Sequence, residues 1–372
     1  MQPQFLKNNI SLKDKIVALD FQLVFLILLL GIISFFTMYS TEQGKLGYYT
    51  QSHIYRFCIF FVIFIICAFL KIQFWHKFTN LFYFLVVILL LAVDFFGIAA
   101  SGSTRWINLF VFNLQPSELM KVALIIFLAK YYNKISTNEV SRIKSMVIPV
   151  FALFVPVALV IAQPDLGTAL LIMIGGLAVI WLAGLRIKYF MFSFVTLTCS
   201  MPVVIAFLKP YQKLRILTFL NPERDPLGAG YQIIQSKIAV GSGGIFGKGF
   251  LKGSQSYLDY LPEKHTDFIF TLFSEEFGFI GCIFLLLIYM LILYRITKIG
   301  QKARSNFAKL YCFGFAVAFF TYVVINMSMV LGLLPIVGAP LPIMSYGGSS
   351  MLSMMVGLGI VMSCNIHNEE RI

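Results

Sequence analysis

Long apolar stretches, separated by shorter polar segments, follow one another along almost the whole chain. They lie at about 19–39, 54–70, 78–100, 116–131, 146–162, 166–183, 189–208, 267–294, 307–331 and 350–366. Most approach or exceed the ~20 residues that a helix needs to cross a bilayer, and they lack the alternation of barrel strands. Because backbone groups in lipid must be hydrogen-bonded within the segment, the pattern predicts helices. We therefore expect an all-α, polytopic membrane protein with about ten spans, forming a single domain over residues 1–372.

The segment 209–266 is the only long stretch without membrane character, and its tyrosines and turn-forming residues favour partial order. If both termini are cytoplasmic, more than half of the 29 Lys and Arg residues fall in cytoplasmic segments, and 209–266 becomes a large extracytoplasmic loop. The net charge of +13 then reflects topology and attraction to anionic headgroups. No basic run with interleaved aromatics is present, so we expect no nucleic-acid partner.

The composition excludes an ordinary soluble globule. Hydrophobic residues make up 59% of the chain and charged residues only 12%, against about 25% charged residues in soluble domains. The first residues are polar, so no cleavable signal peptide is expected. The six cysteines fall in or beside apolar runs without C-x-x-C spacing. Neither a disulfide framework nor a cysteine metal centre is therefore predicted.

Six ionisable side chains gather where the polar loop enters the predicted span 267–294. They are Glu263, Lys264, His265, Asp267, Glu275 and Glu276. Ionisable groups at membrane depth are costly unless they face protein or water, so such a cluster indicates a functional site. Asp267 shares one predicted helix face with Thr271, Ser274 and Gly278, which suits a catalytic base facing a cavity. The alternative is that Asp267 caps a helix that begins near Thr266.

The other members of this cluster are weaker candidates. Glu275 and Glu276 lie deeper in the predicted span, which favours structural roles. His265 could relay protons, although an exposed loop histidine is the commoner case.

A second cluster precedes and opens the predicted span 116–131. Arg105 and Trp106 stand at the membrane edge, and Glu118 and Lys121 follow at i, i+3 on one helix face. Interfacial tryptophans are usually anchors, and a first-turn glutamate usually complements the helix dipole. Lys121 argues against a purely structural reading, because a charge one turn inside an apolar helix is expected to be paired and to face the bundle.

Three further motifs lie on expected loops and helix starts. The glycine-rich GSGGIFGKG, 241–249, contains Lys248 and is flanked by Lys237 and Lys252. Its spacing fails the Walker A pattern, so it is either an anion-binding nest or a flexible turn, and the sequence does not separate the two. Asp165 in QPDLGTA suits a helix N-terminus. SYGGSS, 345–350, follows several prolines and suits a re-entrant turn that packs beneath the site.

Several of these stretches together resemble the shape, elongation, division and sporulation (SEDS) family. The matching motifs are GSTRWINLF and NLQPSELMK (102–121), QPDLGTALL, NPERDPLGAGYQIIQSKIAVGSGGIFGKG, LDYLPEKHTDFIF, EEFGFIG and LPIMSYGGSS. The text LKGSQSYLDYLPEKHTDF resembles the elongation members in particular. The resemblance implies a peptidoglycan glycosyltransferase that polymerises lipid II, with undecaprenyl pyrophosphate as the leaving group. It also implies a class B penicillin-binding protein as partner, together with other elongation-machinery membrane proteins.

The family motifs imply roles for individual residues. Asp267 becomes the catalytic base, Arg105 and Lys121 hold the anionic group of the donor, and Trp106 contacts its sugar or lipid stem. Glu118, Glu263, Lys264, His265 and the three lysines of the glycine-rich stretch complete the expected substrate contacts. No cofactor is required, whereas a divalent cation beside Asp267 remains open. The expected location is the bacterial inner membrane, with the active site on its outer face.

Two alternatives remain open from the sequence. A lipid II flippase would also place charges around a cavity within the membrane, although the chain shows no inverted repeats. A non-catalytic scaffold of the cell-wall machinery would not need Asp267. The glycines of the last three spans, such as Gly314, Gly357 and Gly359, further predict a face on which the helix of a partner could dock.

Overall fold

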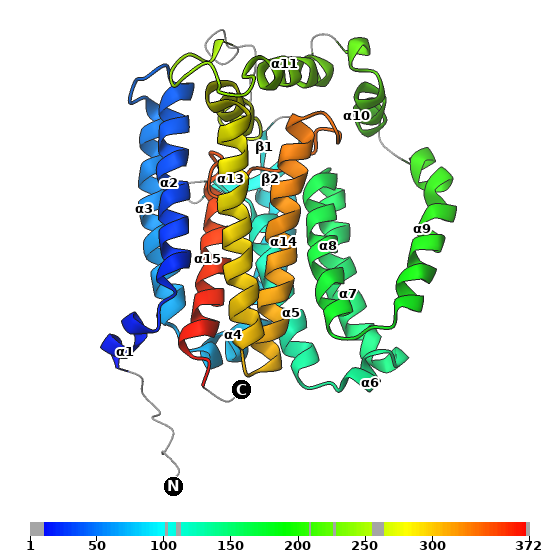
Figure 1. The fold of residues 1–372 in the computed structure, drawn as a ribbon. Coiled ribbons are helices and arrows are strands. Elements are labelled where there is room, and N and C mark those ends of the chain that lie inside the picture. The colour runs from blue at the N-terminus through cyan, green and yellow to red at the C-terminus, as the bar shows by residue number, and fades with distance from the viewer. Residues whose placement is uncertain are drawn as a thin grey trace.

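The computed structural model of the protein describes residues 11–100, 103–108, 113–207, 210–225, 228–254 and 264–369. Its longer helices stand side by side as a bundle, with α9 at one edge and α10 and α11 across one end (Figure 1). The helices are α1 (Leu12–Val17), α2 (Phe21–Thr41), α3 (Tyr48–Phe69), α4 (Ile72–Phe96), α5 (Pro116–Asn133), α6 (Thr137–Val140), α7 (Ile143–Ala162), α8 (Leu166–Leu182), α9 (Ile187–Phe207), α10 (Pro210–Leu220), η1 (Pro222–Arg224), α11 (Ala229–Ser242), α13 (Ile269–Lys302), α14 (Asn306–Val330) and α15 (Gly348–Ile366).

A helix occupies each of the ten stretches in which the sequence predicts a span. Seven of the described helices are long and apolar enough to cross a membrane: α2, α3, α4, α7, α13, α14 and α15. At 17 residues, α8 is a shorter apolar helix. The multi-pass, helical fold is thus confirmed, whereas the count of ten spans stays a prediction.

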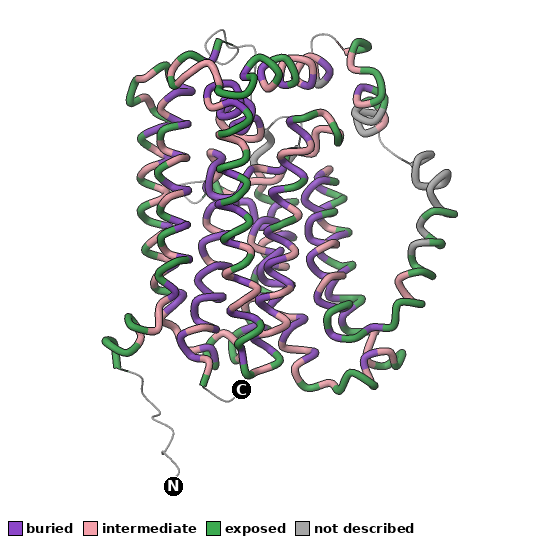
Figure 2. Tube along the Cα trace, viewed as in Figure 1, coloured by how far each residue is buried: buried purple, intermediate pink, exposed green. Residues whose placement is uncertain are grey.

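The centre of the bundle is α15, because 83% of the residues in its apolar stretch are buried. It packs against α3, α5, α13 and α14. Burial is greater in α14 and α15 than in the outer helices, and Figure 2 shows it concentrated in the middle of the bundle. Glycines permit this close packing. A Cβ at Gly359 would lie 2.9 Å from the carbonyl oxygen of Phe64 in α3, and one at Gly357 would overlap the ring of Phe315 in α14. These glycines therefore serve internal packing, and the prediction that Gly357 and Gly359 form a docking face is wrong.

Gly314 also lies at a contact between helices inside the bundle. A Cβ at this position would meet Val179 of α8 and Ile125 of α5. The small residues of α14 thus allow α5, α8 and α14 to approach one another.

A small antiparallel sheet, which the sequence analysis missed, lies between α4 and α5. Its strands are β1 (Ile98–Ala100), β2 (Ser103–Asn108) and β3 (Asn113–Leu114), in the order β1-β2-β3. Trp106 pairs with Ile98, and Ile107 pairs with Leu114. Because β3 leads directly into Pro116, the first residue of α5, the sheet sets where Arg105, Trp106 and the first turn of α5 lie.

The long helix α13 is interrupted at Gly278, whose backbone angles are φ 63° and ψ −163°. Such a break frees backbone groups that must find other partners. The glycine-rich stretch supplies them. The N–H groups of Lys248 and Gly249 donate to the carbonyl oxygens of Glu275 and Glu276 at 3.0 Å, and the N–H of Phe279 donates to Gly244 at 2.9 Å.

These bonds decide between the two readings of the stretch 241–249. Its amides at Lys248 and Gly249 are already used by α13, so they are not open to an anion, and the anion-nest alternative fails there. The predicted partial order of the loop 209–266 is confirmed in its described part by α10, η1 and α11.

Candidate functional site

A cavity of about 770 Å³ opens at the end of the bundle near α11 and the small sheet. It is the larger of the two cavities described here, and its walls come from segments far apart in the sequence. The polar and aromatic residues that line it are Tyr48, Tyr49, Arg56, Arg105, Trp106, Asn113, Gln115, Glu118, Asp165, Gln232, Thr266, Asp267, Phe268, Tyr346, Ser349 and Ser350. We call it the Asp267 cavity. Four of the sequence-predicted site residues line it: Arg105, Trp106, Glu118 and Asp267.

Asp267 lies in the turn that precedes α13. The helix begins at Ile269 and its N-cap residue is Phe268, so the alternative in which Asp267 caps a helix starting near Thr266 is wrong. Since Asp267 precedes the helix and Gly278 breaks it, the predicted four-residue stripe on one continuous helix face does not exist. Asn326 of α14 holds this turn in place, because its side-chain amide donates to the carbonyl oxygens of Asp267 and Ala339 at 2.9 and 2.7 Å.

The loop between α14 and α15 closes around the Asp267 carboxylate. Gly338 has φ 71°, and a Cβ at this position would lie 3.5 Å from Asp267 Oδ2. Glycine at 338 thus combines a left-handed backbone with close approach to the acid.

Arg105 is anchored on the QPD motif at the start of α8. Its guanidinium donates to the carbonyl oxygens of Gln163 and Pro164, and its NH1 lies 3.6 Å from Asp165 Oδ2. Asp165 also accepts from the Thr168 N–H at 3.1 Å, which confirms its predicted role as the N-cap of α8. The structure adds a second role, because Asp165 holds Arg105 at the cavity wall.

Glu118 and Lys121 form a buried ion pair beneath the cavity. The distance from Lys121 Nζ to Glu118 Oε1 is 2.7 Å, and both side chains are only 4% exposed. Tyr322 of α14 completes the group, since its hydroxyl donates to Glu118 Oε2 at 2.8 Å and its ring lies 4.1 Å from Lys121 Nζ. Glu118 lines the cavity, whereas Lys121 lies behind it and is not among the lining residues.

Aromatic residues build another part of the wall, where Tyr49 and Tyr346 line the cavity and His265, which is not a lining residue, lies against Tyr49. The ring of His265 stacks on Tyr49 with centroids 4.1 Å apart, and Tyr49 meets Tyr346 edge-on. Arg56 of α3 lies over the Tyr346 ring, 4.5 Å from its centroid. Burial raises the pKa of the Tyr346 phenol, which therefore stays protonated near neutral pH. His265 is thus half-buried and stacked, and its reading as an exposed loop histidine is wrong.

The remaining predicted contacts lie elsewhere. Lys248 Nζ pairs with Glu275 Oε1 at 2.6 Å, and the side chain of Lys237 packs on Gly332. Lys237, Lys248, Lys252 and Lys264 do not line the Asp267 cavity. Glu263 lies outside the described residues.

The structural reading of the two deeper glutamates agrees with their surroundings. Glu275 is paired with Lys248, and Glu276 accepts a hydrogen bond from Ser40 of α2. Within the part of the chain that the structure describes, no three His, Cys, Asp or Glu side chains gather as a metal site.

Sequence reasoning missed Arg56 and understated the SYGGSS motif. Arg56 falls inside the predicted span 54–70, and a charged residue within an apolar run was the signal that could have identified it. Ser349 of SYGGSS accepts from the Gln115 N–H at 2.8 Å and donates to the Asn113 carbonyl at 3.0 Å. It therefore ties α15 to the start of α5 and lines the cavity, in addition to packing.

Comparison with known proteins places the chain among bacterial cell-cycle proteins. The family profile described as "cell cycle protein" (FtsW, RodA, SpoVE) matches residues 17–371. The peptidoglycan glycosyltransferase MrdB of Escherichia coli K12 is 39% identical over 363 residues, which cover 97% of each protein. The stage V sporulation protein E of Bacillus subtilis is 38% identical over 290 residues, 78% of this chain and 78% of that protein.

Two solved structures share the fold. One, described as "Structural coordination of polymerization and crosslinking by a peptidoglycan synthase complex", matches with a TM-score of 0.83 and 30% identity. The match covers 95% of this chain and all of that one. The other, the rod shape determining protein RodA of Thermus thermophilus, has a TM-score of 0.73 at 24% identity, covers 95% of this chain and 99% of that one, and supports the fold alone.

Proposed function

The chain belongs to the FtsW, RodA and SpoVE family of cell cycle proteins, and we propose that the Asp267 cavity is where it acts. The chain is a peptidoglycan glycosyltransferase, as are the relatives that it matches over nearly its full length. The observation that carries the assignment of the site is the meeting of the Asp267 carboxylate with two guanidinium groups, Arg56 and Arg105, in a single cavity. The two other carboxylates that line this cavity, Glu118 and Asp165, form ion pairs with Lys121 and Arg105. The substrate is lipid II, and the product is a glycan strand.

The proposed chemistry needs one base and several cations. The Asp267 carboxylate accepts the proton of the acceptor sugar hydroxyl, and the oxygen then attacks the anomeric carbon of the donor. The bond from that carbon to the pyrophosphate breaks, so undecaprenyl pyrophosphate leaves with the electron pair. A pyrophosphate departs without protonation, and the second carboxylate of a glycosidase is therefore not obligatory. The chain's own cations stabilise the departing charge.

Arg105 and Arg56 are the side chains placed to do this electrostatic work. Arg105 is held by three acceptors of the QPD motif, and Arg56 is held over Tyr346, so neither needs to reorganise when charge develops. Lys121 supports the site indirectly, because it fixes the Glu118 carboxylate at the cavity floor. Trp106 offers an apolar surface to a sugar or lipid stem.

The proposed topology places the Asp267 cavity on the outer face of the bacterial inner membrane, with both termini cytoplasmic. The termini, short loops and helix ends that this topology assigns to the cytoplasmic side together hold more than half of the 29 lysines and arginines, which agrees with the positive-inside rule. We also assign the chain a crosslinking partner, a class B penicillin-binding protein. Its support is the shared fold with a structure that is described as coordinating polymerization and crosslinking in a synthase complex.

Purified full-length protein in liposomes tests the function directly. Lipid II supplied to the outer leaflet should be converted into glycan strands, which are detected by gel electrophoresis after cleavage of the lipid. Movement of lipid II to the inner leaflet without polymerisation would instead identify a flippase. If lipid II neither polymerises nor moves, even with the partner present, the chain acts as a scaffold.

A further inference from the structure

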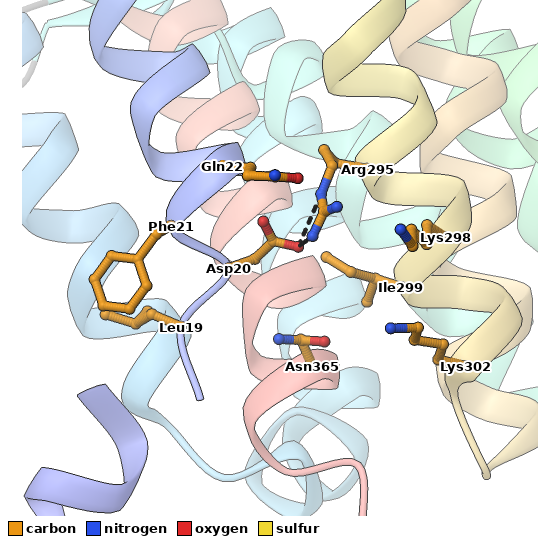
Figure 3. A pocket seen from close by; sticks show the side chains of 9 residues that line it. All are labelled: Leu19, Asp20, Phe21, Gln22, Arg295, Lys298, Ile299, Lys302 and Asn365. Carbon is orange, nitrogen blue, oxygen red and sulfur yellow. Dashed lines mark hydrogen bonds and ion pairs between the residues drawn. The ribbon is translucent and has the colours of Figure 1, made fainter. Parts of the chain in front are cut away.

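A second cavity lies at the opposite end of the bundle from Asp267. It has a volume of about 230 Å³ and is lined by Leu19, Asp20, Phe21, Gln22, Arg295, Lys298, Ile299, Lys302 and Asn365. These residues come from the start of α2 and the ends of α13 and α15 (Figure 3). We call it the Arg295 pocket, and the polymerase chemistry proposed above does not use it.

The depth of this pocket matches a headgroup layer. From the break at Gly278, the 17 to 24 residues to Arg295 and Lys302 span roughly 25–36 Å as a helix, close to the thickness of the hydrocarbon core of a bilayer, about 30 Å. Tyr294, 55% exposed, stands beside Lys298, with the Lys298 amine 5.4 Å from its ring centroid. An exposed tyrosine next to a lysine is typical of the membrane–water interface.

The charges of the pocket are unbalanced. Asp20 is its one carboxylate, and both of its oxygens are used, one by the Leu23 N–H and the other by the guanidinium of Arg295, whose Nε lies 3.0 Å away. Lys298 and Lys302 follow on the same face of α13 and turn their amines toward the space beside Asn365 (Figure 3). Among the described residues, neither lysine forms an ion pair with a carboxylate.

We propose that the Arg295 pocket binds the phosphate group of an anionic membrane lipid, with Lys298 and Lys302 as its cationic ligands and Arg295 beside them. Basic pockets between membrane helices are sites of this kind. The volume is below the about 300–1,000 Å³ of pockets that enclose drug-sized ligands, so it suits a headgroup whose acyl chains remain in the bilayer. Lysines in the last turns of α13 would also suit the helix dipole, but the dipole does not explain a concave site shared by three helices.

A binding experiment in nanodiscs distinguishes a specific lipid site in the Arg295 pocket from general attraction between anionic lipids and a basic protein surface. Wild-type full-length protein in phosphatidylcholine discs that contain a minor fraction of phosphatidylglycerol is compared with Lys298→Gln/Lys302→Gln. The matched control is Lys134→Gln/Lys309→Gln, which removes the same charge from the same end of the bundle outside the pocket. Native mass spectrometry counts the phosphatidylglycerol that each protein retains, and thermal unfolding confirms that the variants are folded.

We expect the pocket variant to lose about thirtyfold in affinity for phosphatidylglycerol, from two lysines at about 1 kcal/mol each, and the control to change little. Lys298→Arg/Lys302→Arg should keep the binding. Equal losses in the pocket variant and the control, or no loss in either, would overturn the proposal. Inorganic phosphate that displaces phosphatidylglycerol at equal concentration would show that the ligand is a free anion, and the lipid assignment would then fail.

Discussion

The Asp267 cavity and the Arg295 pocket contain the same kinds of charged groups but use them differently. In the Asp267 cavity, the ion pair Glu118–Lys121 lies at or below the floor, and Asp267 stands apart from it on the wall. In the Arg295 pocket, the carboxylate of Asp20 is used by Arg295 and by the start of α2. One arrangement leaves a carboxylate at the surface of a large cavity, where it can accept a proton. The other has one carboxylate, Asp20, whose two oxygens already accept hydrogen bonds, beside three cations that can bind an anion but cannot act as a base.

Asp267→Asn should produce the largest change. The amide keeps the size of the side chain but cannot accept the proton, so we expect glycan polymerisation to fall about 10²–10⁴-fold. Stability should change little, because Asn326 holds the backbone carbonyl of residue 267. The control is Glu223→Gln, an exposed acid in η1 that does not line the cavity. If Asp267→Asn still makes long glycan strands from purified lipid II, Asp267 is not the base, and the proposed difference between the two cavities is wrong.

Lys121→Met should strongly destabilise the protein. Removing one partner of a buried ion pair leaves the other charge uncompensated, at a cost of about 3–5 kcal/mol. Glu118→Gln/Lys121→Met removes both charges and should recover most of this loss in thermal unfolding. Polymerisation per folded molecule then reports on the lysine. If the double variant is stable but as inactive as the single one, the Glu118–Lys121 pair serves the reaction itself and not only the fold.

Arg105→Gln should weaken polymerisation about 10–100-fold, the effect of losing one charged hydrogen-bonding group. Fold and expression should be retained, because Asp165 still caps α8. Arg56→Gln, at another part of the cavity wall, is the matched comparison. If Arg105→Gln lowers thermal stability but leaves polymerisation per folded molecule unchanged, this arginine only stabilises the QPD motif and does not act on the substrate.

Arg295→Gln should cost stability without affecting the chemistry. The arginine is 18% exposed and links α13 to Asp20 in α2, so we expect a loss of about 1–3 kcal/mol. Polymerisation per folded molecule should remain at the wild-type level, in contrast to Arg105→Gln. A large fall in kcat at normal stability would show that the far end of the bundle is coupled to the Asp267 cavity.

The smallest effect is expected at His367, which should cause a modest loss in the free energy of unfolding at acidic pH. It follows α15 near the Arg295 pocket, and burial lowers its pKa to about 4, with Lys15 and Lys71 acting in the same direction. The folded protein therefore keeps the imidazole neutral, whereas the unfolded chain protonates it below about pH 6.5. The stability that the buried His367 contributes is thus fully present above pH 6.5 and is lost as pH falls toward 4. Between pH 7 and 5.5 we expect a loss of about 1 kcal/mol in thermal unfolding. His367→Gln should remove this part of the pH dependence.

The membrane class, the helical fold and the local residue pairs could be predicted from the amino-acid order alone. Hydropathy marks the helices because lipid forbids unpaired backbone groups, so long apolar runs have few alternatives. Glu118–Lys121 and Asp165–Thr168 could be read from spacing, since i, i+3 neighbours meet on any helix or cap. The family motifs then pointed to Asp267 without showing what surrounds it.

The contacts between residues far apart in the sequence depend instead on how the helices pack together. Arg105 finds Asp165 60 residues away, and Arg295 finds Asp20 275 residues away, and no local pattern encodes either contact. The role of the glycine-rich stretch stayed open for the same reason. Its amides could serve an anion or another backbone, and the break at Gly278 in α13 determined which. Helical periodicity depends on each segment alone, whereas the partner of a charge or an amide depends on which segments pack together.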